Sequence, residues 1–266
     1  MRWLSDAERL RAARRPAILI TVIAGRGHAP REAGAKMLVA GDELLGTIGG
    51  GNLEMIAVER AREMLAAMGE QDAASQPETL QFRLNDKESN PYGRQCCGGE
   101  MTVLLEPLPV PPAVAVFGVG NVGMELARIL SRHELDLHVA DSRAEHLEQL
   151  HELEPAVARV FPHRAVLGEA VVAELPEGAH VLIMTHDHAE DLHLCDAALR
   201  HPALGSIGLI GSRAKWSRFR KKLIEEGHAP DLVDTIRCPI GLPEVAGKHP
   251  AVIAVSVAAA LLSSAQ

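Results

Sequence analysis

Residues 113–123 read AVAVFGVGNVG, an apolar run that leads into three glycines, Gly118, Gly120 and Gly123. A short apolar run before a glycine turn predicts a buried strand, and the residues after the turn have a helical pattern as far as about residue 133. In such a strand–turn–helix the first glycine makes the tight turn, the second lets backbone approach a pyrophosphate, and the third lets helix pack on strand. The stretch therefore predicts a Rossmann-like unit whose three glycines bind a cofactor.

The residues that follow extend this pattern. Further strand patterns occur at 135–141, 180–185 and 206–211, and each is followed by a helical pattern. Strands that alternate with helices predict a parallel sheet covered on both faces. We therefore expect an α/β protein with a Rossmann-like parallel-sheet domain over residues 113–266.

Asp141 closes the second of these strands, about twenty residues after the glycine turn. An acid at this place hydrogen-bonds a ribose hydroxyl in dinucleotide-binding proteins, so Asp141 is a predicted cofactor contact and NAD(P) a candidate ligand. Arg143 could meet a 2′-phosphate, although a solvated surface arginine is the simpler interpretation. The alternative for the whole motif is a retained fold whose glycines only pack.

The first 105 residues predict a mixed α/β domain. Strand patterns occur at 17–25, 35–40, 79–85 and 100–108, the stretch 41–52 reads as a turn, and a helix runs from about Asn52 to Met68. The opening residues have a charged helical pattern with Ser5 as predicted N-cap. EPLPVPP at 106–112 has four prolines in seven residues, and because proline stops helices and central strands we interpret it as a linker.

Composition and charge argue against some classes of protein. The 266 residues are 47% hydrophobic and 23% charged, which is typical of a chain that folds. A formal net charge of −8 and only 3% aromatic residues argue against nucleic acid as a partner, because phosphate is repelled and few rings can stack on bases. The first residues lack the apolar core of a signal peptide and no apolar stretch is long enough to span a bilayer, so we expect a cytoplasmic protein.

Two of the four cysteines are adjacent, in the stretch RQCCGGEM at 94–101. In a reducing cytoplasm Cys96 and Cys97 are expected to be thiols rather than a disulfide. Soft sulfur suits a thiophilic metal or a cofactor that itself carries sulfur, and Gly98 and Gly99 leave room beside the thiols. We predict that this stretch contacts a cofactor, and the alternative is two small buried residues without chemistry.

A second glycine turn, GTIGGGNLE at 46–54, lies in the N-terminal part. Consecutive glycines let backbone N–H groups converge on an anion, and the N-terminus of the following helix adds unpaired donors and the positive end of its dipole. The predicted contacts are Gly49, Gly50, Gly51 and Asn52. A simple hairpin-like turn with an asparagine cap is the alternative.

Two further loops have residues suited to anions. Upstream of the second glycine turn, Pro30 and Arg31 lie in a predicted loop, and Arg31 could clamp a phosphate with two N–H groups. The run GSRAKWSRFRKK at 211–222 opens another helix, in which Gly211, Ser212 as cap and Arg213 are predicted contacts and Lys215 adds positive charge. The cationic run and the acidic remainder of the protein offer complementary patches for steering partners.

The stretch THDHAEDLHLCD at 185–196 concentrates histidines at the end of a predicted strand. His186 and His188 are expected at the carboxyl edge of the sheet, where open α/β folds bind ligands. The same stretch could ligate zinc through these two and His193 and Cys195, but the last two would lie inside the following helix and need not share a face with the first pair.

Taken together, these motifs resemble the XdhC/CoxI family of molybdenum cofactor chaperones, or xanthine dehydrogenase accessory factors. The resemblance spans nearly the whole chain in the family's order, through HAPREAGAKM, GTIGGGNLE, QCCGGEMTVLLEP, VFGVGNVG, THDHAEDL, IGLIGSRAKW and CPIGLP.

The resemblance implies a protein that binds molybdenum cofactor, or molybdopterin. It would hold the cofactor while a cysteine desulfurase exchanges its terminal ligand for sulfur, and would deliver it to a molybdenum hydroxylase of xanthine dehydrogenase or aldehyde oxidase type. Cys96 and Cys97 are then the expected contacts to molybdenum through the cofactor. We also expect an accessory factor rather than an enzyme, and a homodimer.

Two other classes stay open at this point. An NAD(P)-dependent oxidoreductase would use the first glycine turn and Asp141, and predicts turnover of nicotinamide with a small substrate. A thiol redox sensor would use Cys96 and Cys97, and predicts a reversible structural change on mild oxidation. Neither explains every motif in the sequence.

Overall fold

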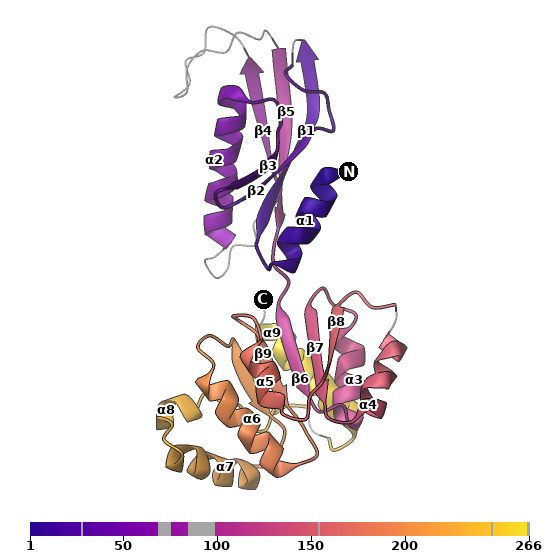
Figure 1. Ribbon diagram of the computed structural model, residues 1–266, viewed down its shortest axis with the longest axis vertical. Helices are drawn as coiled ribbons and strands as arrows, with labels where there is room; N and C mark the ends of the chain where they lie inside the picture. Colours follow the sequence, from indigo (N-terminus) through magenta and orange to yellow (C-terminus); the bar gives the residue numbers. More distant parts are fainter. Residues whose placement is uncertain (28, 69–75, 85–98, 154, 246, 265–266) are drawn as a thin grey trace. The chain divides into compact units, whose positions relative to one another are not determined.

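The computed structural model describes residues 1–27, 29–68, 76–84, 99–153, 155–245 and 247–264 (Figure 1). The chain forms two compact units, Met1–Val110 and Pro111–Gln266, and each contains a five-stranded sheet with its own core. The predicted α/β class is therefore confirmed. Within the described ranges, no helix combines the length and the apolar character that crossing a bilayer requires.

The N-terminal unit has an antiparallel sheet of order β3-β2-β1-β5-β4. Its strands are β1 (Ala17–Gly27), β2 (Lys36–Ala40), β3 (Glu43–Gly46), β4 (Glu78–Leu84) and β5 (Gly99–Leu108). Helix α1 (Arg2–Ala12) covers part of one face, and α2 (Gly51–Met68) covers the other (Figure 1).

Strand β1 shows why both faces need a helix. Successive side chains of a strand point to opposite faces. Ile18, Ile20 and Val22 therefore join the core under α2, while Ala17 and Leu19 join the smaller core under α1. Because residues 17–20 of this strand are apolar on both faces, the strand must be covered on both sides.

The sequence interpretation is wrong at two places in this unit. Residues 43–46 form the edge strand β3 rather than part of a turn. The sequence did not predict this strand because an edge strand has only a weak apolar pattern. Helix α1 begins at Arg2, and the Ser5 hydroxyl donates to the Arg2 carbonyl at 2.8 Å instead of capping the helix. Strand β5 ends at Leu108, as the strand pattern at 100–108 predicts, and so it continues through Pro107. Leu105 is the last residue that pairs with β4, and a proline is tolerated where one side is open.

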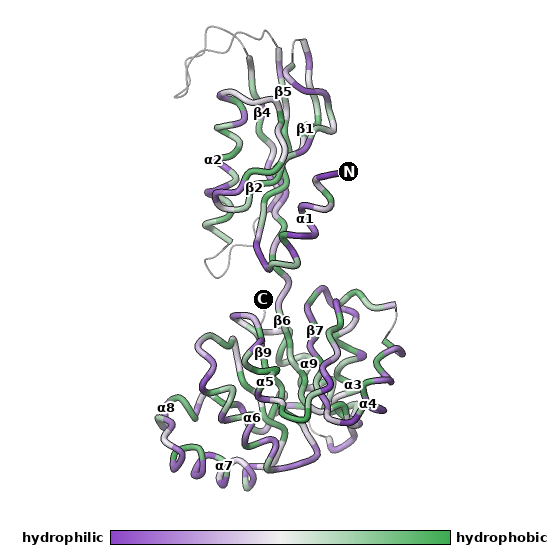
Figure 2. Tube along the Cα trace, viewed as in Figure 1, coloured by the Kyte–Doolittle hydropathy of each residue, from purple (hydrophilic) through white to green (hydrophobic). Residues whose placement is uncertain are grey.

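The C-terminal unit has the predicted parallel sheet, of order β10-β9-β6-β7-β8. Its strands are β6 (Ala113–Phe117), β7 (Asp136–Asp141), β8 (Arg159–Arg164), β9 (His180–Ile183) and β10 (Ser206–Leu209). All five residues of β6 are buried, as expected for the central strand of a sheet covered on both faces. Figure 2 shows this strand as hydrophobic along its length, with hydrophilic residues on the outer helices.

Helices form a layer on each face of this sheet. Val114 and Val116 of β6 share a core with α3 (Asn121–Leu130), the 3₁₀ helix η1 (Gln149–Leu153) and α9 (Pro250–Ser264). The alternate residues of β6 share the other core with α5 (Gly168–Ala173), α6 (His188–Arg200), α7 (Arg213–Glu225) and α8 (Pro230–Val233). A short helix, α4 (Ala144–Glu148), follows β7. Strand β8 escaped prediction because it is a polar edge strand that contains Pro162.

The strand order places a ligand crevice. The chain moves from β6 to β7 on one side, and β9 then returns to pair with β6 on the other side. In open α/β sheets, ligands bind at such a switch point, beyond the carboxyl ends of the strands. The loops after β6 and β9 are therefore where a site is expected.

Candidate functional site at the switch point

The three glycines after β6 differ in what surrounds them. Gly118 has a φ of +100°, and a Cβ there would lie 2.5 Å from the Met184 carbonyl oxygen. A Cβ on Gly123 would lie 2.0 Å from the Gly118 carbonyl oxygen, so close packing explains both residues. A Cβ on Gly120 would have nothing within 4 Å. Packing does not explain Gly120, which has the free space that the approach of a ligand requires.

The first turn of α3 adjoins a pocket. No side chain caps this helix at Gly120, whereas Asp187 caps α6 and Ser212 caps α7 with side-chain oxygens. Unpaired N–H groups and the positive end of the helix dipole favour an anion here. The pocket has a volume of about 470 Å³ and is lined by Val119, Gly120, Asn121, Met124, Glu125, Arg128, His146, Gln149, His249 and Pro250.

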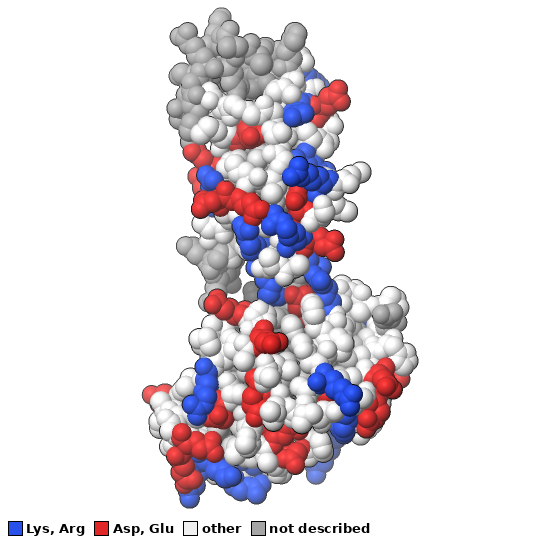
Figure 3. All heavy atoms as spheres, viewed as in Figure 1, with Lys and Arg blue, Asp and Glu red and all other residues white. Residues whose placement is uncertain are grey.

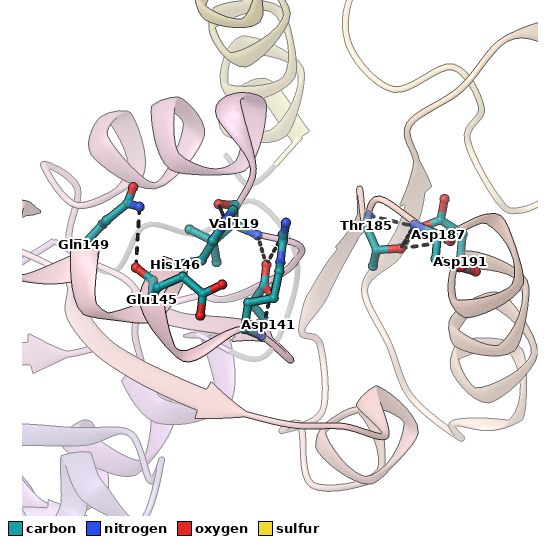
Figure 4. Close-up of polar contacts among 9 residues, drawn as sticks. Val119, Asp141, Glu145, His146, Gln149, Thr185, Asp187 and Asp191 are labelled. Carbon is teal, nitrogen blue, oxygen red and sulfur yellow. Dashed lines mark hydrogen bonds and ion pairs between the residues drawn. The ribbon is translucent and has the colours of Figure 1, made fainter.

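His146, from α4, is a lining residue that sequence reasoning missed. Its Nδ1 lies 2.7 Å from the Val119 carbonyl oxygen (Figure 4). Because a carbonyl only accepts, Nδ1 is the donor and Nε2 is left for other partners. No sequence pattern near residue 146 signals this contact, which depends on α4 packing beside the glycine turn.

Asp141, at the end of β7, is fully engaged within the protein. Its two carboxylate oxygens accept from the Val119 N–H at 2.8 Å, the Arg143 N–H at 2.9 Å, and Nε and Nη2 of Arg143 at 2.8 Å each (Figure 4). A carboxylate has about four acceptor sites, so a ribose hydroxyl would have to displace one of these donors. Burial acts to raise the pKa of Asp141, but the hydrogen bonds from Arg143 and Val119 outweigh it and lower the pKa to about 2.

The lowered pKa of Asp141 predicts acid sensitivity. Because the folded value of about 2 lies below the ordinary 3.8, the unfolded chain binds more protons between these values. The stabilisation, about 2 kcal/mol, is complete above about pH 4 and is lost as the pH falls through 2. Urea unfolding should therefore show a stability gap between wild type and Asp141→Asn near neutral pH that roughly halves at about pH 3. An equal gap at both pH values would contradict this assignment.

The loop after β9 lies against the glycine turn. A Cβ on Gly118 would be 2.8 Å from the Thr185 Cα, so the two loops are in direct contact. His186 and His188 follow the end of β9, as predicted, and both are exposed. The His188 ring meets Phe219 edge-on, with 6.4 Å between ring centres. The structure thus brings the first glycine turn and the predicted histidines to one edge of the sheet.

Glu190, in the first turn of α6, is a second group that sequence reasoning missed. Burial raises the pKa of its carboxyl group, and the charges of Asp141 and Asp191 act in the same direction, while Thr185 and His186 oppose it. A half-buried acid with a raised pKa at the edge of the sheet where ligands bind is a candidate for proton exchange with a ligand. An acid in the first turn of a helix is common, so the sequence alone does not distinguish Glu190 from a dipole partner.

The zinc alternative finds no support here. The His193 side chain is 68% exposed, whereas Cys195 is fully buried, so the two do not converge. Burial is also the main cause that raises the pKa of the Cys195 thiol. Among the residues that the structure describes, no three metal-ligating side chains form a group.

The glycine turn of the N-terminal unit does converge on an anion, which is Glu54 of the same chain. One Glu54 oxygen accepts from the N–H groups of Ile48 at 2.9 Å and Gly50 at 3.0 Å and from the Thr47 hydroxyl. Burial acts to raise the pKa of Glu54, but these hydrogen bonds lower it overall. A phosphate at this turn would meet a carboxylate. This contact of Glu54 could have been predicted from the sequence. An acidic side chain in the first turn of a helix is attracted to the unpaired backbone N–H groups at that end.

Pro30 and Arg31 pack against this same turn. A Cβ on Gly49, whose φ is +132°, would lie 2.8 Å from the Pro30 ring and 3.5 Å from Cγ of Arg31. Helix α2 begins at Gly51, one residue before the predicted start, so Asn52 lies in its first turn. The structure therefore brings these two predicted loops together, and their binding of a cofactor stays a prediction.

The cysteine stretch is described only from its last glycine. Gly99 begins β5 and pairs with Gly27 at the end of β1. Cys96, Cys97 and Gly98 lie outside the described residues. Their contact with a cofactor, and with molybdenum through it, stays a prediction.

The loop after β10 corrects one expectation. Ser212 caps α7 as predicted, accepting from the Lys215 N–H at 3.2 Å. Lys215 does not face an incoming anion, because it is 6% exposed and its ammonium lies 2.5 Å from Asp191. A Cβ on Gly211 would lie 2.7 Å from Cδ of Lys215, so packing explains this glycine. Arg213 is exposed at the start of the helix.

The run 213–222 is not the single cationic patch expected from the sequence. Arg220 forms an ion pair with Asp234 at 2.6 Å, and Lys221 forms one with Glu225 at 3.7 Å. Acidic and basic side chains lie next to one another around α7 and α8 (Figure 3). The electrostatic fields of such paired charges largely cancel, so these pairs contribute little to steering a partner.

Comparisons with known proteins cover both units. The family model of the XdhC Rossmann domain matches residues 114–261, and that of the XdhC and CoxI family matches residues 10–76. The uncharacterized protein YqeB of Escherichia coli is 30% identical over 264 residues, which are 98% of this chain and 46% of YqeB, so the chain spans about half the length of this relative. A crystal structure of a xanthine dehydrogenase from Bacillus halodurans is 20% identical, with a TM-score of 0.49 over 100% of this chain and 96% of that chain.

The match to the XdhC Rossmann domain covers the parallel sheet, the switch-point loops and α9 up to Leu261. The second match begins in α1 and covers the loop of Pro30 and the glycine turn at 46–54. Because the matched residues exceed half of the chain, this protein belongs to the XdhC and CoxI family.

Proposed function

We propose that this protein binds molybdenum cofactor as cargo and serves the maturation of a xanthine dehydrogenase-type molybdenum hydroxylase. Family membership supports the class of client. The observation that carries cofactor binding is the open space at Gly120, beside a helix N-terminus that no side chain caps. Molybdopterin is a phosphate ester, and its phosphate has the charge that this position favours.

The dimensions of the site fit part of such a cargo. The pocket of about 470 Å³ beside Gly120 lies within the roughly 300–1,000 Å³ of small-molecule sites. Gly120 and Asn121 would hold the phosphate through backbone N–H groups, and His186 would face the same crevice. The thiols of Cys96 and Cys97 are proposed contacts for the dithiolene and metal, because soft sulfur ligands suit them.

The proposed partners are a cysteine desulfurase, which supplies sulfur to the held cofactor, and the client hydroxylase of xanthine dehydrogenase or aldehyde oxidase type. The cytoplasmic location and the homodimer expected from the sequence belong to this proposal. The dinucleotide alternative has less support, because Asp141 would have to release a donor to bind a ribose.

Cofactor retention tests the proposal. Wild type purified without oxygen should retain close to one molybdopterin per chain, measured by the fluorescence of the oxidised pterin. Gly120→Val, which fills the open space, should lower the affinity at least about tenfold, or about 1.4 kcal/mol, with a melting temperature within a few degrees of wild type. Gly120→Ala, which fills less of it, should fall between the two.

The alternatives give other outcomes. Saturable binding of NAD(P) without retention of molybdopterin would support the oxidoreductase. Equal cofactor retention by Gly120→Val and wild type would remove the glycine turn from the site.

A further inference from the structure

A buried ion pair joins the loops that follow β9 and β10. The Lys215 ammonium lies 2.5 Å from Oδ2 of Asp191, and the two side chains are 8% and 0% exposed. The ammonium also donates to the Ile210 carbonyl at 2.9 Å and lies 5.2 Å from the centre of the Phe219 ring. An ammonium has three N–H donors, so this one is satisfied within the protein.

The other oxygen of Asp191 anchors the loop that carries His186. Oδ1 of Asp191 accepts from the Thr185 N–H at 3.0 Å and from the Thr185 hydroxyl at 2.8 Å (Figure 4). The same hydroxyl accepts from the Asp187 N–H at 3.3 Å, and Asp187 in turn caps α6. The residues on either side of His186 are therefore held, while the His186 side chain is exposed.

Stability alone does not account for this pair. Burying two charges costs several kcal/mol per ion, and replacing a buried pair by apolar residues of similar volume is often neutral or stabilising. An apolar pair would offer no acceptor to Thr185, whose N–H and hydroxyl groups both donate to Asp191. What the ion pair adds is therefore the placement of a loop.

That loop packs against the glycine turn that borders the proposed cofactor site. Gly118 packs against Met184 and Thr185, so a shift of Thr185 moves His186 relative to the glycine turn. Residues that orient a ligand-contacting side chain without touching the ligand often affect affinity as much as direct contacts do when they are mutated.

We propose that Asp191 and Lys215 are positioning residues that hold His186 at the switch point for contact with the anionic cofactor. The role in binding rests on the proposed function. The placement of the loop does not, so the two are tested by separate measurements.

The first test replaces the charged pair by an apolar one. Asp191→Leu/Lys215→Met should fold with a melting temperature close to that of wild type, lose the protection of the Thr185 amide against hydrogen exchange, and weaken cofactor retention about tenfold. The matched control is Arg220→Met/Asp234→Leu, which removes an exposed ion pair between α7 and the C-terminal end of α8 and should leave amide protection and retention unchanged.

The second test keeps the ion pair and serves also if the apolar double variant does not fold. Thr185→Val removes the hydroxyl that bonds to Asp191, whereas Thr185→Ser retains it. Thr185→Val should weaken retention about tenfold and Thr185→Ser should not. His186→Ala should weaken retention in the wild-type background but add little to Thr185→Val, because both changes remove the same contact.

Two results would overturn the proposal. One is a protected Thr185 amide in the apolar double variant, and the other is wild-type retention in Thr185→Val. Failure of wild type itself to retain cofactor would refute the proposed function instead, and the amide measurement would still decide whether the pair holds the loop.

Discussion

Gly123→Ala is expected to destabilise the C-terminal unit by at least about 3 kcal/mol, because its Cβ would lie 2.0 Å from the Gly118 carbonyl oxygen. Helix propensity acts in the opposite direction, since alanine inside a helix is favoured over glycine by about 1 kcal/mol. The clash should win, because the contact is with backbone in a turn that itself abuts Met184 and Thr185. A fall of roughly 10 °C in melting temperature is the expected size.

Gly120→Ala is the matched control for this prediction. The same substitution is made three residues earlier in the same motif, where a Cβ has nothing within 4 Å and φ is −77°. Its melting temperature should stay within a few degrees of wild type, as for a change of less than about 1 kcal/mol. Equal destabilisation by both variants would show that the turn differs from the structure described above.

Cys96→Ser/Cys97→Ser is expected to abolish delivery of active cofactor. Wild type mixed with a cysteine desulfurase and a cofactor-free molybdenum hydroxylase should restore hydroxylase activity, and the double variant should restore less than about a tenth as much. The physical reason is that serine offers a hard, protonated oxygen in place of a soft thiolate. The protein alone should turn over neither purines nor aldehydes, since the proposal makes the cofactor its cargo.

A matched variant separates this effect from loss of a thiol in general. Cys195→Ala removes a cysteine from the core of the C-terminal unit and should leave delivery per folded protein unchanged. Equal restoration of activity in the complete absence of this protein, over a range of cofactor concentrations, would refute the chaperone and return the oxidoreductase to consideration.

Much of the C-terminal unit could be predicted because its signals are local. The continuous apolar run of β6, the glycine spacing after it and the Ser212 cap each lie within a few residues, where sterics and backbone hydrogen bonding decide the conformation. The edge strands β3 and β8 were missed for the converse reason. Strands with one partner and one open side need little apolar surface, so their sequences resemble turns.

The candidate site could be predicted only in outline. Motif order indicated which loops meet at the switch point, and Gly118 does pack on Thr185. The roles of the charged residues could not be read in the same way. Lys215 lies in the first turn of α7, just after the Ser212 cap, where a lysine is expected to bind an anion. In the structure it is instead buried against Asp191.

The sequence by itself determined the parallel sheet, the glycine turn and the family, because each depends on patterns that are contiguous along the chain. Only the tertiary structure decided which polar groups are engaged. Asp191 and Lys215 are 24 residues apart, and Val119 and Asp141 are 22 apart, so each pair forms only when two elements pack side by side. Because an unpaired charge is costly once buried, a fold that buries Asp191 and Asp141 must also bring a partner to each carboxylate.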